Sequence, residues 1–113
     1  MAAKAKSALE LEFEEACLAD LAECRKLGYN PSYFLQMLED YGAVETARRL
    51  INSDMVPDGF TRLYMLNRLD LTLEAGIVDN PRFRSLFDQR TLANCEARLA
   101  KAGYAARSSS SAI

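Results

Sequence analysis

Apolar residues recur every three or four positions along most of this chain, which is the spacing of one face of an α-helix. The pattern is clear over residues 7–28. There Ser7 and Glu10 form the sequence signature of a capping box, and Gly28 is suited to end a helix. We therefore predict a first helix from Ser7 to Leu27. Its apolar stripe comprises Leu9, Phe13, Ala16, Cys17, Cys24 and Leu27.

Two shorter helices are predicted next. Asn30 is a suitable cap and Pro31 a suitable first helical residue, and Gly42 ends the segment that they begin. Residues 43–52 again show helical spacing. Residues 53–60 contain a proline and a glycine, and they predict the longest connecting loop.

The second half of the chain begins with a Gly-Phe-Thr turn. We expect Gly59 to adopt a positive φ, because glycine tolerates that conformation best, and Thr61 to cap the helix that follows. A further helix restarts near Asp70, which we interpret as its N-cap.

Two more helical starts complete the pattern. Asn80 and Pro81 repeat the cap-and-proline signal, and Asp88 caps a final helix that Gly103 ends. Alternation with a period of two, which would indicate strands, is absent. We predict an all-α fold, a compact bundle of five to seven helices of which several are short.

The domain organisation follows from the same pattern. Residues 8–104 form a single helical domain, between a flexible N-terminus at residues 1–7 and a disordered, serine-rich tail at residues 105–113. The first helix, residues 8–27, is acidic and carries two cysteines on its apolar face. We expect it to attach loosely to the domain or to mediate self-association.

Composition excludes several kinds of chemistry. The chain has 113 residues, of which 50% are hydrophobic, and it has three cysteines and no histidine. Without histidine it cannot form a Cys-His pair or a Ser-His-Asp triad, and no cysteine pair has zinc-site spacing. No apolar run is long enough to cross a membrane. We expect a cytoplasmic protein with reduced thiols, no cofactor and no bound metal.

Charge is distributed unevenly. Residues 1–45 carry four basic and nine acidic side chains, a balance of −5, whereas residues 46–113 carry ten basic and seven acidic ones, a balance of +3. The arginines of the second half could bind phosphates. Acidic residues are interspersed among them, so we expect nucleic-acid binding to be weak at most.

Six short motifs resemble those of a family of small bacterial proteins that has no established activity. The resemblance covers roughly residues 27–104 and implies no catalytic residues, and the family lacks the long first helix as a fixed feature. The matching residues are Tyr29, Asn30, Pro31, Phe34 and Met37; Gly42, Val44, Glu45, Thr46 and Ala47; Gly59, Phe60, Thr61 and Leu63; Arg68, Leu69, Asp70, Leu71, Thr72 and Glu74; and Pro81, Phe83, Leu86 and Phe87, followed by Arg98, Leu99, Gly103 and Tyr104.

The charges within the stretch from Asn67 to Pro81 allow three interpretations. Asp70 and Glu74 are four residues apart and would share one face of a helix. The first interpretation is helix capping combined with an ion pair to Arg68. The second is a polar patch that binds a partner. The third is a carboxylate pair for a metal or for acid–base chemistry.

We therefore interpret the chain as a small, non-catalytic protein-interaction module, such as an adaptor, an inhibitor or a subunit, with an unknown protein partner in a bacterial cell. Tyrosine and arginine are enriched in protein interfaces, which favours this interpretation. A nucleic-acid-associated domain is the alternative, and a carboxylate- or metal-dependent enzyme is more remote. The candidate interaction patch comprises Arg62, Tyr64, Arg68, Asp70, Glu74, Arg82 and Arg84.

Overall fold

The computed structural model describes residues 7–104, which form helices and no strands. Six α-helices and two 3₁₀ helices follow one another with short connections, so the prediction of an all-α fold is confirmed. None of these helices is long and apolar enough to cross a membrane. The elements are α1 (Ala8–Lys26), α2 (Ser32–Tyr41), α3 (Ala43–Ile51), α4 (Asp58–Met65), η1 (Leu69–Leu71), α5 (Leu73–Val78), η2 (Pro81–Leu86) and α6 (Gln89–Lys101).

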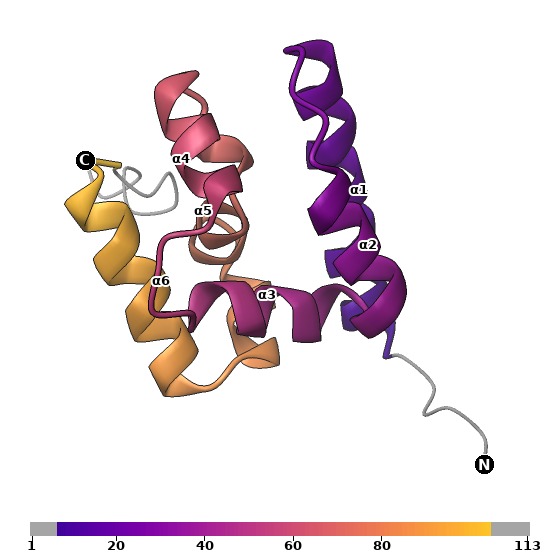
Figure 1. The fold of residues 1–113 in the computed structure, drawn as a ribbon. Helices are drawn as coiled ribbons and strands as arrows, with labels where there is room; N and C mark the ends of the chain where they lie inside the picture. Colours follow the sequence, from indigo (N-terminus) through magenta and orange to yellow (C-terminus); the bar gives the residue numbers. More distant parts are fainter. Residues whose placement is uncertain (1–6, 105–113) are drawn as a thin grey trace.

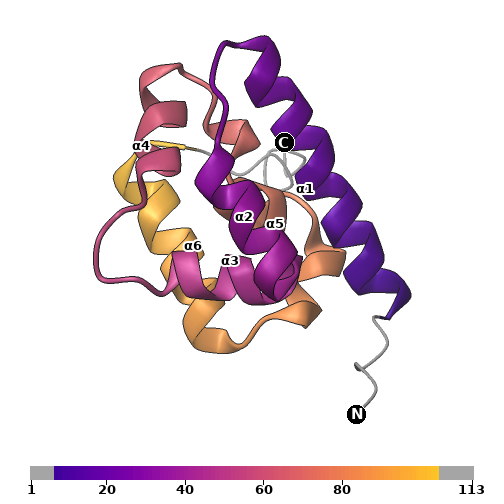
Figure 2. The same ribbon diagram turned by 45° about the vertical axis from the view of Figure 1, so that its right-hand side comes forward.

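The helices are arranged around the short helix α5. α3 crosses one end of the bundle and packs against α1, α2 and α6 (Figure 1). α5 lies inside, behind α2 in the view of Figure 2, and it packs against α6 and η2. The core is therefore built from residues of nearly every element. Its buried members include Phe13, Cys17, Ala43, Ala47, Ile51, Phe60, Ala75, Ile77, Phe83, Cys95 and Leu99.

The first helix is part of this core. Four of its residues, Phe13, Cys17, Leu21 and Cys24, are buried. Phe13 packs edge-on against Phe83 and Phe87, with ring centroids 5.2 and 5.4 Å apart. The expectation of a loosely attached helix is therefore wrong for the described chain. Most of the acidic residues that suggested it lie on other faces of α1, whereas the four buried side chains pack against the rest of the domain.

Several predicted helix ends are confirmed. Ser7 and Glu10 form the capping box, and the Asp88 side chain accepts a hydrogen bond from Thr91 N–H at the start of α6. Gly28 and Gly103, at φ of 85° and 81°, follow the last residues of α1 and α6. These signals are local, since the capping group and the backbone group that it satisfies lie within three residues.

The predicted starts of α2 and α4 are wrong. α2 begins after Pro31, and Asn30 makes no side-chain cap. α4 begins at Asp58 behind Pro57, so Thr61 lies within the helix instead of capping it. Residues 1–6 and 105–113 are outside the described residues. The predictions for the flexible N-terminus before Ser7 and for the serine-rich tail therefore remain predictions.

Candidate functional site

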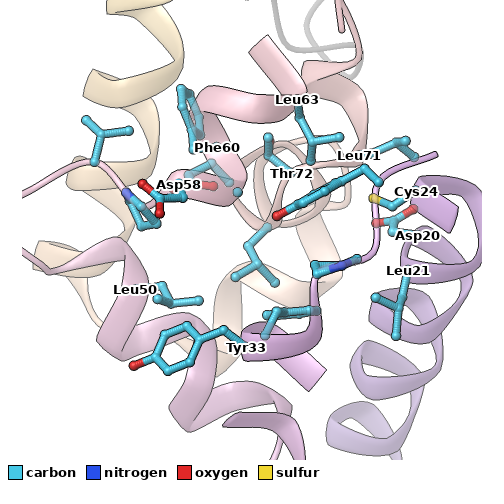
Figure 3. Close-up of a pocket in the computed structure, with 18 of the residues that line it drawn as sticks. Asp20, Leu21, Cys24, Tyr33, Leu50, Asp58, Phe60, Leu63, Leu71 and Thr72 are labelled. Carbon is cyan, nitrogen blue, oxygen red and sulfur yellow. The ribbon is translucent and has the colours of Figure 1, made fainter. Parts of the chain in front are cut away.

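A cleft of about 500 Å³ opens between α1, the start of α2, the α3–α4 loop and α4, with η1 and the start of α5 on its inner side. Most of its lining is apolar, and Figure 3 shows side chains from these elements converging on it. A volume of this size is typical of sites that hold a ligand or several side chains of a partner. The apolar lining includes Cys17, Leu21, Cys24, Phe34, Leu50, Met55, Val56, Phe60, Leu63, Leu71 and Leu73.

One wall of the cleft is a face of α1. Cys17, Leu21 and Cys24 recur there at helical spacing, and Asp20 lies in the same stripe, three residues after Cys17 and four before Cys24. The helix therefore positions one carboxylate among apolar side chains. Figure 3 shows Asp20 beside Cys24 on this wall, with Asp58 and Phe60 across the cavity.

The opposite wall is α4, which is closely approached by Tyr29. A Cβ atom added to Gly59 would lie 3.0 Å from the Tyr29 hydroxyl oxygen, so a glycine lets the tyrosine lie against the helix. Gly59 is not among the glycines with positive φ, and the predicted reason for this glycine is therefore wrong. The backbone of Tyr29 is also held in place, because its N–H donates a hydrogen bond to the Cys24 carbonyl at 2.9 Å. The Arg62 guanidinium lies 5.3 Å from the Tyr29 ring centre.

The Asp20 carboxylate is only partly exposed, and it forms no hydrogen bond or ion pair within residues 7–104. The pKa of Asp20 is raised from 3.8 to about 7, first by burial and then by the nearby Asp70 and Glu23 carboxylates, while Arg68 opposes part of the rise. Arg68 has the smallest of these effects, and its guanidinium donates hydrogen bonds of 3.0 and 3.1 Å to Asp70. Asp20 is thus an acid in an apolar wall without a basic partner of its own.

Glu74 also lines the cleft, but its charge is compensated. It is buried on α5, and it accepts a hydrogen bond from the Arg98 guanidinium of α6 at 2.8 Å. Arg98 also donates to the Leu50 and Ile51 carbonyls at the end of α3, at 3.2 Å each. Burial raises the pKa of Glu74, and Arg98 opposes part of that rise. Arg98 therefore joins three helices, a role that sequence reasoning missed because Glu74 lies 24 residues away.

The predicted pairing of Arg68 with Asp70 is confirmed, but the predicted cap is wrong. Asp70 lies in the 3₁₀ turn η1, and the N-cap of α5 is Thr72. The Thr72 hydroxyl oxygen accepts a hydrogen bond from Ala75 N–H at 3.1 Å and donates to the Leu69 carbonyl at 2.7 Å. The turn η1 buries Leu71 and moves the helix start by two residues.

The structure does not bring all the predicted patch residues together. Glu74 is 3% exposed and cannot contribute to a surface patch. Arg82 pairs with Glu12 of α1, and Arg84 pairs with Glu96 of α6, at 2.8 Å each. Arg62 and Tyr64 are exposed on α4. No group of three Cys, Asp or Glu side chains suited to holding a metal occurs within residues 7–104.

The three thiols are buried and free. Burial, together with nearby carboxylates, raises the pKa of Cys17 to about 12 and that of Cys95 to about 12, and it also raises the pKa of Cys24. Each thiol therefore stays protonated near neutral pH, and a protonated thiol is a poor nucleophile. The cysteines act as small core side chains.

Comparison with known proteins adds no relative. No family model matches the chain, and neither a curated protein nor a solved structure is significantly similar to it. The resemblance of its motifs to a bacterial family therefore remains a prediction, and the function has to be argued from the cleft.

Proposed function

We propose that this domain is a small, non-catalytic interaction module whose cleft binds an apolar segment of a partner protein. The observation that carries the proposal is the cleft itself, which remains open at about 500 Å³ and is lined mainly by apolar side chains in a domain of this size. Concave apolar sites of this kind bind ligands because a bound group removes their surface from water.

The rim of the cleft favours a protein segment over a small molecule. Tyr33, Met55 and Val56 line the cleft and are 73%, 81% and 49% exposed. Exposed apolar side chains that adjoin a concavity extend the binding surface beyond it, and such patches mark protein interfaces. A helix or extended strand of a partner would cover this rim while one or two of its side chains fill the cavity.

The surface arginines give less support to the nucleic-acid alternative. Glu45 holds both Arg48 and Arg49, at 2.6 and 2.8 Å. Arg82 and Arg84 are paired with Glu12 and Glu96. Phosphates would have to compete with these carboxylates, which weakens the electrostatic attraction on which nonspecific nucleic-acid binding depends.

Site-specific photo-crosslinking tests the proposal. A benzophenone amino acid would replace Met55 or Tyr33 on the rim, and in matched controls it would replace Leu11, which is 47% exposed on α1 and outside the cleft lining. We expect a partner to crosslink from the rim positions only, through a segment rich in apolar residues. A synthetic peptide of that segment should bind the wild-type chain and bind Val56→Asp at least tenfold more weakly. Equal crosslinking from Leu11, or equal binding to Val56→Asp, would reject the cleft as the interaction site.

A further inference from the structure

We propose that the cleft selects partner segments that carry a lysine or arginine among apolar residues, and that this basic side chain forms an ion pair with Asp20. The inference rests on the proposed function, since it names the chemistry of the segment that the cleft binds. It would also make binding dependent on pH near neutrality.

The charged side chains that line the cleft are acidic. Three carboxylates line the cleft, those of Asp20, Asp58 and Glu74, and its lining contains no lysine or arginine. Glu74 is neutralised by Arg98. Asp58 is exposed in the first turn of α4, where the partial positive charge of the helix N-terminus favours a carboxylate. Asp20 is therefore the carboxylate in this cleft whose charge the described chain leaves uncompensated.

The groups that face Asp20 also favour a cation. Asp70 of η1 and Glu23 of α1 are negative, and Arg68 is held by Asp70. Among uncharged neighbours, Cys24 shares the wall with Asp20, and its thiol pKa is raised in part by this carboxylate. Tyr29 lies farther along the lining, and its pKa is also raised, mainly by burial. The local field thus attracts a cation, and the apolar walls would strengthen its pairing with Asp20 by excluding water.

A pH dependence follows from the same geometry. A cation in the cleft binds the ionised carboxylate and not the protonated one. Because the pKa of Asp20 is about 7 in the free protein, most of these carboxylates are ionised at pH 8 and few at pH 6. The affinity for a segment with a basic residue should therefore fall by roughly tenfold between these pH values.

The test is selection from a displayed library of random peptides against four proteins at pH 8. These are the wild-type chain, Asp20→Asn, Val56→Asp and the control Asp54→Asn. Asp54 is an exposed acid in the same loop as the rim but outside the cleft lining, so its variant loses the same charge as Asp20→Asn. Wild type and Asp54→Asn should enrich peptides in which lysine or arginine adjoins apolar residues. Asp20→Asn should enrich apolar peptides without that basic residue.

Fluorescence anisotropy with the best wild-type peptide then gives affinities. We expect Asp20→Asn to weaken binding about tenfold or more at pH 8 and to remove the pH dependence, whereas Asp54→Asn changes affinity by less than about twofold. Selected peptides that need the cleft but lack basic residues, or that bind Asp20→Asn equally well, would overturn this inference and leave the proposed function standing. Peptides that bind Val56→Asp as tightly as wild type, or no selected peptides at all, would count against the proposed function itself.

Discussion

Asp20 and Glu74 line the same cleft, and they differ in whether a basic side chain pairs with the carboxylate. Glu74 is more deeply buried, yet Arg98 neutralises it and also holds the carbonyls at the end of α3. Asp20 lies in a largely apolar wall, and the described chain provides it with no hydrogen-bond or ion-pair partner. The region around Glu74 is therefore complete in itself. The region around Asp20 bears an electrostatic cost that a bound cation would remove.

This difference distinguishes a charged group that stabilises the fold from one that is available to bind a partner. A buried ion pair with satisfied hydrogen bonds holds elements in register, and removing one member leaves the other charged and unpaired. A half-buried acid without a counterion lowers the stability of the free domain. Positions that break the rules of stable folding in this way are candidates for function.

The largest effect is expected from removing α1, which forms the wall around Asp20. A chain that starts at Lys26 loses Phe13, Cys17, Leu21 and Cys24 from the core. We expect it to show no cooperative thermal transition by circular dichroism, whereas a chain that starts at Ser7 keeps one. A cooperative transition in the shorter chain would show that the region around Glu74 folds by itself and that α1 is an accessory wall.

Arg98→Met should have the next largest effect. It leaves Glu74 charged and buried and frees two backbone carbonyls, so the free energy of unfolding should fall by about 3–5 kcal/mol in urea denaturation. Arg84→Met is the matched control. Its pair with Glu96 joins a partly exposed side chain to an exposed one, and its loss should cost no more than about 1 kcal/mol. Equal costs for the two variants would mean that the region around Glu74 has no special structural role.

Asp20→Asn should have a smaller effect of opposite sign. The pKa of Asp20 is about 7 in the folded chain and 3.8 as its ordinary value, so the folded state holds the proton more tightly. The wild type therefore loses stability as pH rises from about 4 to 7, and the loss is complete above 7. We expect Asp20→Asn to be more stable than wild type at pH 8 and equally stable at pH 3. Solvent at the mouth of the cleft screens the Asp20 charge and reduces the free energy that its ionisation costs the wild type. The expected increase in the free energy of unfolding of Asp20→Asn is therefore limited.

Urea denaturation at pH 3, 5.5 and 8 measures this difference, with Asp54→Asn as the control for net charge. The free energy of unfolding of Asp20→Asn relative to wild type should increase from pH 3 to pH 8, and that of Asp54→Asn should not. A stability difference that does not change with pH would mean that Asp20 is solvated like a surface acid, and the contrast with Glu74 would then disappear.

Substitutions in the turn that leads from η1 into α5 should change the stability less. Thr72→Ala removes the cap of α5 and should cost about 1 kcal/mol, whereas Thr72→Ser keeps most of the stability. Asp70→Ala breaks the partly exposed pair with Arg68, and we expect it to cost less than Thr72→Ala. Thermal denaturation of the three variants ranks them. A larger cost for Asp70→Ala than for Thr72→Ala would restore Asp70 as the residue that organises this turn.

The sequence predicted those parts of the fold that depend on neighbouring residues. The ends of α1 and α6 follow from Ser7, Gly28, Asp88 and Gly103, because each signal acts within one helical turn. The start of α5 could not be assigned from the sequence, since Asp70 and Thr72 are both good caps. The burial of Leu71 between them decides the choice.

The candidate site was less accessible to sequence reasoning. The pair of Glu74 and Arg98 joins residues 24 positions apart, and only tertiary packing shows that they meet. Asp20 did leave a signal, because it is an acid within the apolar stripe of the first helix. That spacing could have identified an unusual carboxylate. It could not have shown that a cleft opens beside it, since the opposite wall comes from α4.

The weakest effect is expected for nucleic-acid binding. It tests the arginine-rich surface as an alternative binding site to the acidic cleft. Hydrogen bonds from Arg48 and Arg49 lower the pKa of Glu45 to about 2, so this carboxylate is ionised at neutral pH and offsets one of the two positive charges beside it. We expect dissociation constants no tighter than roughly 10⁻⁵ M for labelled DNA or RNA at physiological salt. Fluorescence anisotropy measures them, and Glu45→Gln should strengthen binding modestly because it releases both arginines. Submicromolar wild-type binding that falls steeply with salt, and that charge reversal at Arg48 and Arg49 abolishes, would place function on this surface instead of in the cleft.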